Sequence, residues 1–241
     1  MNERRIAVFL TIVVIVVVSF ALIVVAAWGS YGRLPAELEG FIVALAGGAL
    51  MVSAVLELID PATDVAPLWA VGACVLAGAA VFSGLDKLVK ARFGSDSGGG
   101  LLAAITLDGI PENLALGVAL IGAGPLQVAS LSGSIFLSNL PEAAGGAQEM
   151  AEGRSKPKVL ALWTATAVLL SAAALAGNLL LSGVPDAALG LIRCVAGGAV
   201  AASLATEVFP KAFKEDSYLT GVATARWDSS LPSHWINWAD R

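Results

Sequence analysis

The chain has 241 residues, of which 57% are hydrophobic and only 14% are charged, and its formal net charge is −5. A soluble globular domain is typically about a quarter charged, so this composition predicts a membrane protein and argues against a soluble enzyme. No basic cluster indicates nucleic acid, and no segment resembles a phosphate-binding loop. The two cysteines, Cys74 and Cys194, lie in apolar stretches without metal-ligand spacing, so we expect them to be buried core residues.

Seven apolar segments are long enough to cross a bilayer as helices, which takes about 20 residues. The first begins soon after the N-terminus and is too long for a signal-peptide core, so we expect it to be a retained span. Short turns rich in Gly, Pro and Asp separate the segments. The chain is therefore predicted to be an all-α, polytopic transmembrane helical bundle. The segments are 6–28, 38–60, 67–88, 99–123, 127–150, 159–182 and 187–211.

The predicted bundle covers residues 1–216, and the stretch after it differs in composition. Residues 215–225 begin like another apolar helix, but the last 15 residues carry three of the six tryptophans and the single histidine, His234. This change predicts an atypical tail over 217–241, either a truncated or altered eighth span or an interfacial tryptophan-rich segment.

Lysine and arginine are distributed unevenly between the two sides of the predicted bundle. If the segments alternate in direction, nine basic residues fall on one side, and only Arg4 and Arg5 fall on the other. Loops rich in Lys and Arg face the cytoplasm, so the N-terminus is predicted to lie outside the cytoplasmic membrane. The nine residues are Arg33, Lys87, Lys90, Arg92, Arg154, Lys156, Lys158, Lys211 and Lys214.

A short phrase occurs twice, in the fourth and fifth segments, and places a proline and carboxylates deep inside apolar sequence. The first copy is LDGIPE at Leu107–Glu112, and the second is LSNLPE at Leu137–Glu142, 30 residues later. A carboxylate at the centre of a membrane helix costs about 2.5–3.5 kcal/mol on insertion scales. Asp108, Glu112 and Glu142 therefore need a compensating partner, which we expect to be a cation or water.

These residues predict an all-oxygen cation site near the middle of the membrane. Residues four apart share a helix face, so Asp108 and Glu112 point together, and the second copy aligns a serine with its glutamate. Such ligands suit Mn, Mg or Fe, and zinc less, because imidazole and thiolate are absent. The alternative is a pair of proline kinks with protonated, hydrogen-bonded glutamates. The predicted ligands are Asp108, Glu112, Glu142 and Ser138, with Asn139 and Asn113 nearby.

Two further acids lie near the ends of segments. Glu57 stands near the end of the second segment and Glu207 near the end of the seventh. With the predicted orientation, Glu57 could gather a cation outside and Glu207 could release it into the cytoplasm; alternatively, both cap or hydrate the interface. Arg193 is expected to extend outward to the interface and not to pair inside.

At these residues the chain resembles the ZIP (Zrt/Irt-like) metal-ion transporters, over about residues 38–220. The fourth span of that family reads His-Asn-x-Pro-Glu-Gly, and the matching stretch here is DGIPEN at Asp108–Asn113. The fifth reads His-(Asn/Glu/Asp)-x-Pro-Glu-(Gly/Ala), matched by SNLPEA at Ser138–Ala143. The resemblance implies eight spans in a three-plus-two-plus-three arrangement, with both termini outside and metal bound between the fourth and fifth spans.

The chain departs from the family pattern at several positions. Asp108 and Ser138 replace the two histidines, and the sixth segment lacks an acidic residue that bridges two metals in the family. The resemblance therefore implies a secondary carrier of one divalent cation (Zn, Mn or Fe class), without an organic cofactor, as a homodimer in the lipid bilayer. Two alternatives remain: a divergent, non-transporting membrane metal sensor or interaction protein, and a proton- or sodium-coupled carrier of an organic substrate.

Overall fold

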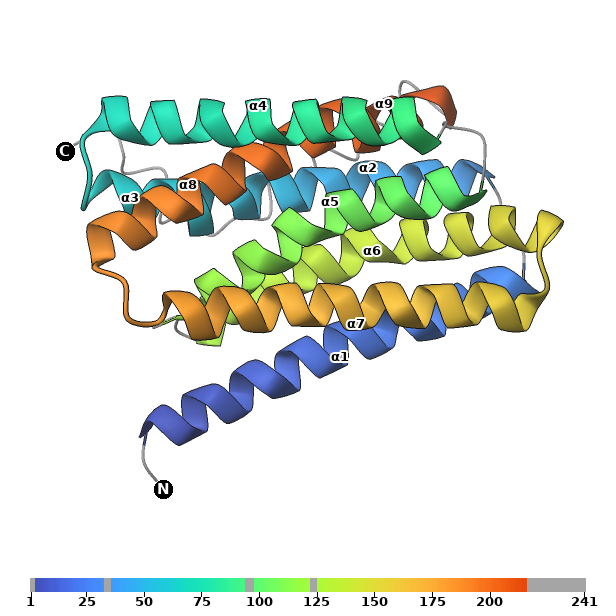
Figure 1. Cartoon of the computed structure of the whole chain (residues 1–241), viewed down its shortest axis with the longest axis horizontal. Helices are drawn as coiled ribbons and strands as arrows, with labels where there is room; N and C mark the ends of the chain where they lie inside the picture. Colours follow the sequence, from blue (N-terminus) through green and yellow to red (C-terminus); the bar gives the residue numbers. More distant parts are fainter. Residues whose placement is uncertain (1–2, 33–35, 94–97, 122–124, 216–241) are drawn as a thin grey trace.

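The structure is a computed structural model that describes residues 3–32, 36–93, 98–121 and 125–215. Within these ranges every regular element is a helix, so the all-α prediction is confirmed (Figure 1). Two short π-helices, η1 and η2, interrupt the α-helices. The elements are α1 (Glu3–Tyr31), α2 (Ala36–Ser53), η1 (Ala54–Ile59), α3 (Asp60–Thr63), α4 (Leu68–Phe93), α5 (Gly98–Ala119), α6 (Pro125–Gly153), α7 (Lys156–Leu181), α8 (Asp186–Ser203), η2 (Leu204–Val208) and α9 (Phe209–Glu215).

Each predicted apolar segment coincides with one helix or with a continuous series of helices. The second segment comprises α2, η1 and α3, and the seventh comprises α8, η2 and α9. In the described part of the chain, five helical stretches are long and apolar enough to cross a membrane. The predicted tail, 217–241, lies outside the described residues. The five stretches are Ile12–Tyr31, Gly40–Thr63, Leu68–Arg92, Lys156–Leu181 and Asp186–Lys214.

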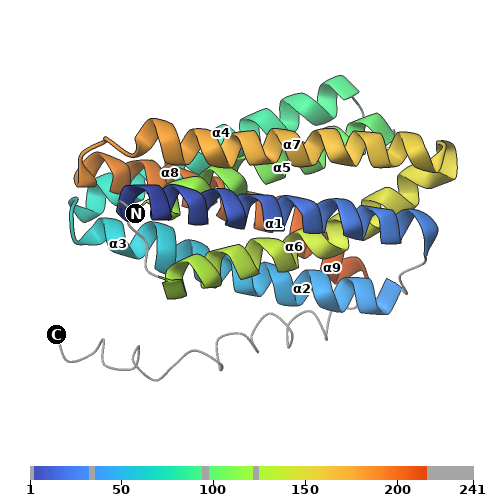
Figure 2. The ribbon, with the colours of Figure 1, turned by 90° about the horizontal axis from the view of Figure 1, so that it is seen from below.

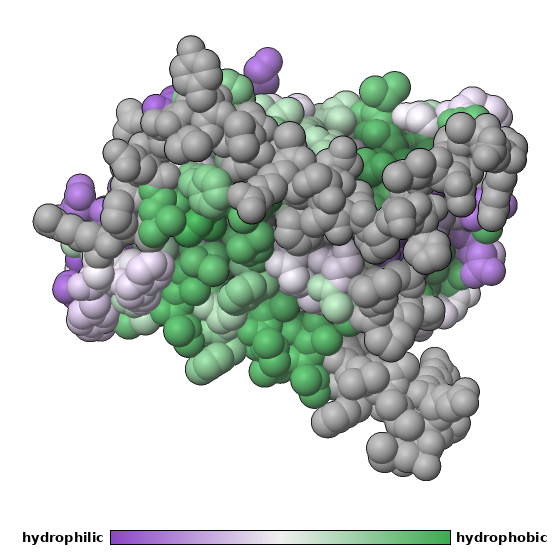
Figure 3. Space-filling view, turned by 180° about the vertical axis from the view of Figure 1, so that it is seen from behind, coloured by the Kyte–Doolittle hydropathy of each residue, from purple (hydrophilic) through white to green (hydrophobic). Residues whose placement is uncertain are grey.

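The surface of the bundle is apolar where the surface of a soluble protein would be polar. Trp69 of α4 and Leu180 of α7 are each 77% exposed, and Leu68 and Leu76 of α4 are almost as open. Figure 3 shows hydrophobic side chains over the middle of one face and hydrophilic side chains at both ends. This distribution matches a bundle whose middle contacts lipid and whose ends contact water.

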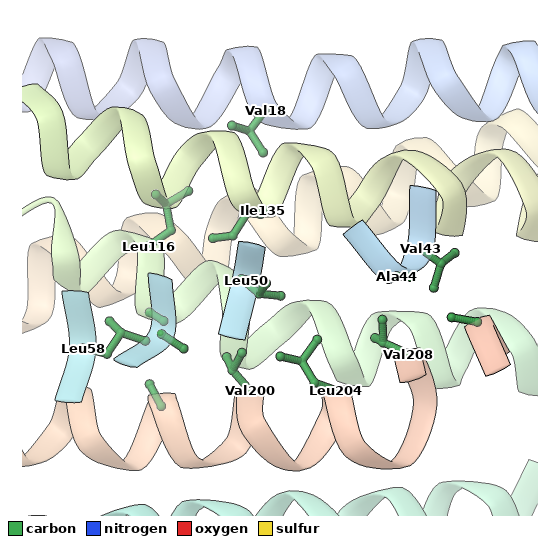
Figure 4. Close-up of a cluster of buried hydrophobic side chains, with 14 residues drawn as sticks. Val18, Val43, Ala44, Leu50, Leu58, Leu116, Ile135, Val200, Leu204 and Val208 are labelled. Carbon is green, nitrogen blue, oxygen red and sulfur yellow. The ribbon is translucent and has the colours of Figure 1, made fainter. Parts of the chain in front are cut away.

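The long helices run back and forth along one axis, and α5 and α6 cross the middle of the bundle (Figure 1). Figure 2 shows α1 running between α6 and α7, and it packs against both of these helices. The largest core cluster joins α2, α5, α6 and α8 through side chains such as Leu50, Leu116, Ile135 and Val200 (Figure 4). The two helices that carry the Pro-Glu phrases are therefore enclosed by the others.

An internal repeat relates the two ends of the chain at a spacing of 150 residues. The sequence AGGA at 46–49 recurs at 196–199, and each copy is followed by a serine (53 and 203) and a glutamate (57 and 207) in the same register. The helices repeat at the same spacing, because α2 at 36–53 matches α8 at 186–203 and each leads into a π-helix. Matching helices run in opposite directions in Figure 1, so the repeat is inverted.

The packing around α5 and α6 follows the same symmetry. Helix α1 packs on α6 as α7 packs on α5, and α2 packs on α6 as α8 packs on α5. A Cβ atom at Gly29 would lie 2.1 Å from the carbonyl oxygen of Ala144, and one at Gly177 would lie 2.7 Å from that of Leu114. Ala144 and Leu114 both stand two residues after the glutamate of a Pro-Glu phrase. Glycine thus permits equivalent close crossings next to both phrases.

The two π-helices have a common physical cause, a proline in the turn that follows. Pro61 lies in the first turn of α3, and Pro210 is the second residue of α9. A proline ring clashes with the carbonyl four residues earlier in an α-helix and donates no hydrogen bond, and a wider π turn relieves this clash. Glu57 and Glu207 lie within these π-helices. The two acids predicted near span ends therefore occupy equivalent places in the fold.

The close approach of α4 and α8 yields a test of the fold. A Cβ atom at Gly78 would lie 1.9 Å from the carbonyl oxygen of Val195, whereas one at Gly84 on the same helix would meet nothing within 4 Å. Gly78→Ala is expected to lower the free energy of unfolding by about 1–3 kcal/mol through overpacking. Gly84→Ala is expected to leave it unchanged or raise it slightly. Thermal unfolding in detergent measures both, and equal effects would contradict this helix contact.

Candidate functional site

The two Pro-Glu phrases lie within continuous helices that pack against each other. Pro111 is inside α5 and Pro141 is inside α6, and both helices extend beyond their proline. Glu112 is 1% exposed, so its carboxylate is enclosed by the bundle, and Glu142 is half-buried. The structure thus places both glutamates in the interior, each one residue after the proline of a central helix.

Two of the predicted weaker ligands are also buried. Asn113 and Asn139 are 3% and 6% exposed. The Asn113 amide donates a hydrogen bond of 2.9 Å to the Gly109 carbonyl of its own helix. In this conformation Asn113 therefore supports α5 near its proline.

The side chains of Asp108 and Ser138 lie outside those described, although their backbone positions belong to α5 and α6. Among the side chains that are described, no group of three His, Cys, Asp or Glu residues could hold a metal ion. The convergence of Asp108, Glu112 and Glu142 on one cation therefore stays a prediction.

A row of serines on α6 leads toward Glu142. Ser130, Ser134, Ser138 and Glu142 follow one another at intervals of four residues, so they share one face of the helix. The Ser53 hydroxyl of α2 lies 2.7 Å from that of Ser134 and 3.4 Å from that of Ser130. This row offers neutral oxygen atoms along the helix. The row was not predicted from the sequence, although its four-residue spacing is visible there.

Glu207 lies in a cluster of charged groups near the junction of α8 and α9. Its carboxylate forms an ion pair with the Lys90 ammonium, which also lies 3.0 Å from a carboxylate oxygen of Asp86. Glu142 interacts electrostatically with both Glu207 and Lys211. Glu207 is therefore close to the second Pro-Glu phrase and is at the same time bonded to a basic side chain of α4.

Arg193 closes the end of α5, so the prediction that it extends outward is wrong. Its guanidinium donates hydrogen bonds of 3.1 Å to the carbonyls of Val118 and Ile121. These carbonyls lie in and just after the last turn of α5, and the Val118 carbonyl also accepts a hydrogen bond of 3.1 Å from the Ile121 N–H. Glu57 also interacts electrostatically with Arg193. Capping of a buried helix end thus decides the orientation of this side chain.

Other polar contacts hold the helices around α5 and α6 in register. Asn178 of α7 donates a hydrogen bond of 3.0 Å to the Gly117 carbonyl of α5, and the Ser19 and Ser171 hydroxyls lie 2.5 Å apart between α1 and α7. Both cysteines are free thiols; the prediction of a buried core position is confirmed for Cys194, whereas Cys74 is half-buried.

Most basic residues in the described part of the chain gather at one end of the bundle, whereas Arg4, Arg5 and Arg193 lie elsewhere. The ends of α4, α6 and α9 and the start of α7 lie together at the right of Figure 1. The turns at the opposite end carry Asp60, Asp64 and Asp186. Arg33 lies outside the described residues. The basic residues of the first end are Lys87, Lys90, Arg92, Arg154, Lys156, Lys158, Lys211 and Lys214.

Two comparisons with known proteins identified no relative of this chain. The chain matches no protein-family model, and a search of curated proteins found no similar sequence. We therefore infer function from the chemistry of the side chains around α5 and α6.

The cap formed by Arg193 predicts a clear loss of stability. Arg193→Met removes two hydrogen bonds from a charged donor to the carbonyls of Val118 and Ile121, so the free energy of unfolding should fall by about 1.5–3 kcal/mol. Arg92→Met is the control, because Arg92 is exposed at the end of α4 and should change stability by about 0.5 kcal/mol or less. Chemical unfolding in mixed micelles measures both variants. A stable Arg193→Met protein would show that the cap is dispensable.

Proposed function

We propose that this chain is a secondary carrier that moves a divalent metal cation of the Zn, Mn or Fe class across the cytoplasmic membrane into the cytoplasm. The observation that carries the proposal is the burial of Glu112, which is 1% exposed on a central helix of an apolar bundle. Glu142 occupies the corresponding place on the neighbouring helix, 30 residues later. The resemblance of both phrases to the ZIP transporters supports the same function.

Electrostatics favours a cation as the substrate. A buried carboxylate is costly in a bilayer unless it is paired or protonated, and a divalent cation would pair with several carboxylates at once. Carboxylate and hydroxyl oxygens are ligands that hard and borderline cations accept. In the proposed site Asp108, Glu112 and Glu142 bind the ion. The serine row of α6 would offer oxygens along the route from the opposite, acidic end.

The inverted repeat supports transport by alternating access. Secondary carriers commonly bind substrate near the membrane midplane, between repeats of opposite orientation. Here α5 and α6 lie between two such repeats, and both Pro-Glu phrases sit in that central pair. Such an arrangement gives a carrier two related conformations, and transport between them needs no ATP hydrolysis.

A gap beside α5 leaves this helix room to move. An apolar groove of about 320 Å³, open toward the outside of the bundle, lies between α4, α5 and α8, and Pro111 and Leu114 line it. A proline weakens the helix locally, because one backbone hydrogen bond is missing. We propose that α5 bends at Pro111 into this space during transport.

In this proposal α5 and α6 also span the membrane, which makes seven spans in all. They have 22 and 29 residues, or about 33 and 44 Å at 1.5 Å per residue, enough for a hydrocarbon core of about 30 Å. The basic end then faces the cytoplasm and the N-terminus lies outside.

Transport measurements test the site. Glu112→Gln and Glu142→Gln each remove a charged ligand and should lower metal uptake into proteoliposomes at least about tenfold, the equivalent of about 1.4 kcal/mol. Glu149→Gln, an exposed position on α6, is the matched control and should transport like the parent.

Competition among Zn, Mn, Fe and Mg in the same assay identifies the ion. Uptake by both glutamine variants at the parent rate would refute the site. Metal-dependent thermal stabilisation without any flux would instead indicate a membrane metal sensor, and an organic substrate would give no metal flux.

Labelling of single cysteines tests the orientation. In a chain with Cys74→Ala and Cys194→Ala, Asp64→Cys and Asp186→Cys should react with a membrane-impermeant thiol reagent on intact cells. Ser155→Cys, in the turn between α6 and α7, should react only after permeabilisation. The opposite pattern would invert the proposed topology.

A further inference from the structure

The charged cluster at the basic end suggests how this end of the bundle is closed. Lys90 stands in the last turn of α4, and its ammonium bridges Asp86 on its own helix and Glu207 on η2. The Asp86 and Glu207 side chains are 10% and 25% exposed, whereas the Lys90 side chain is 40% exposed. The carboxylates are thus largely enclosed, and the cation that neutralises them reaches in from the water-facing side.

The position of Glu207 connects this cluster to the central helices. Glu142 on α6 is near enough to Glu207 to interact with it electrostatically. Ser203, one turn before Glu207, is 1% exposed. In the proposed transport cycle, a cation that leaves Glu142 for water at the basic end would pass the ion pair of Glu207 and Lys90.

The equivalent position in the other repeat is in a different state. Glu57 occupies the place of Glu207 in η1, at the opposite end of the bundle. In the described part of the chain Glu57 has no ion pair at contact distance, since the guanidinium of nearby Arg193 bonds to carbonyls of α5. Glu207 is therefore bound by a basic side chain, whereas Glu57 is not. A carrier in which one end is closed while the other is open would show such a difference between its two ends.

We infer that Lys90 is a latch that holds the basic end shut, and that its ammonium must leave Glu207 before a cation can pass between Glu142 and the water at that end. This inference rests on the proposed transport function. The chemistry suits the role, because departure of the Lys90 ammonium would leave two neighbouring carboxylates, Asp86 and Glu207, that a passing cation can contact. The lysine is long, flexible and partly in water, so it can exchange its carboxylates for solvent.

Cysteine accessibility tests the latch without any transport measurement. The reporter is Ser203→Cys in a background with Cys74→Ala and Cys194→Ala, modified from the basic end by an impermeant thiol reagent. Adding Lys90→Met should speed modification about threefold to tenfold, the range expected for loss of a partly buried ion pair. Lys87→Met, an exposed lysine on the same helix, is the control and should have no effect.

The charge-exchanged pair Lys90→Glu with Glu207→Lys should restore the slow rate, which separates a latch from general loosening of the fold. An unchanged rate in Lys90→Met, or a rate that the exchanged pair fails to slow, would overturn the latch whether or not metal is transported. Faster modification combined with an absence of metal flux in every variant would uphold the latch and reject the transport proposal instead.

Discussion

A carboxylate enclosed in an apolar helical bundle has to be balanced by a cation, a proton or a hydrogen-bond donor, because the surrounding side chains and lipid cannot solvate its charge. The structure contains three different responses to this constraint. Lys90 neutralises Glu207 at direct contact, Arg193 lies near Glu57 but bonds elsewhere, and Glu112 is fully enclosed in the centre. Under the proposed function, a transported cation would bind between the central carboxylates.

The inverted repeat explains why these acids occur where they do. One sequence pattern, AGGA followed by serine and glutamate, builds a close-packed helix that passes into a π-helix, and it does so once in each direction along the bundle. Small residues permit tight crossings, and a proline follows each π turn, where the wider turn relieves the clash of its ring. Related sequences therefore place similar acids at opposite ends, while their neighbours differ. The difference between Lys90 and Arg193 as neighbours turns a symmetric scaffold into one with two distinct ends.

The central pair of helices depends on its neighbours for its shape. Asn178 and Arg193 both bond to carbonyls in or just after the last turn and a half of α5, and glycines allow α1 and α7 to approach immediately beyond each Pro-Glu phrase. The hydrogen bonds hold the C-terminal end of α5, and an apolar groove lies beside Pro111 on another side of the helix. A helix held at its end and loosely packed at its proline is suited to bending at one defined place.

Hydropathy predicted each helix to within about five residues, and five of the helical stretches in the described part of the chain are apolar enough to cross a membrane. The sequence also predicted which two helices carry the functional acids. A proline and a carboxylate are costly in an apolar helix, and they occur together in both the fourth and the fifth segment. The repeat of 150 residues and the serine row are visible in the sequence but become meaningful only when the helices they mark are seen to pack equivalently.

The amino-acid sequence by itself determined that this protein is an all-helical bundle with acids inside it, since burial of backbone and apolar side chains depends on local composition. Only the tertiary structure decided which partner each charged side chain has. Lys90 and Glu207 are 117 residues apart, and Arg193 lies 72 and 75 residues from the carbonyls that it caps. Such pairings depend on how helices cross, and neither the hydrophobic pattern nor the charge of a single segment encodes the crossing of distant helices.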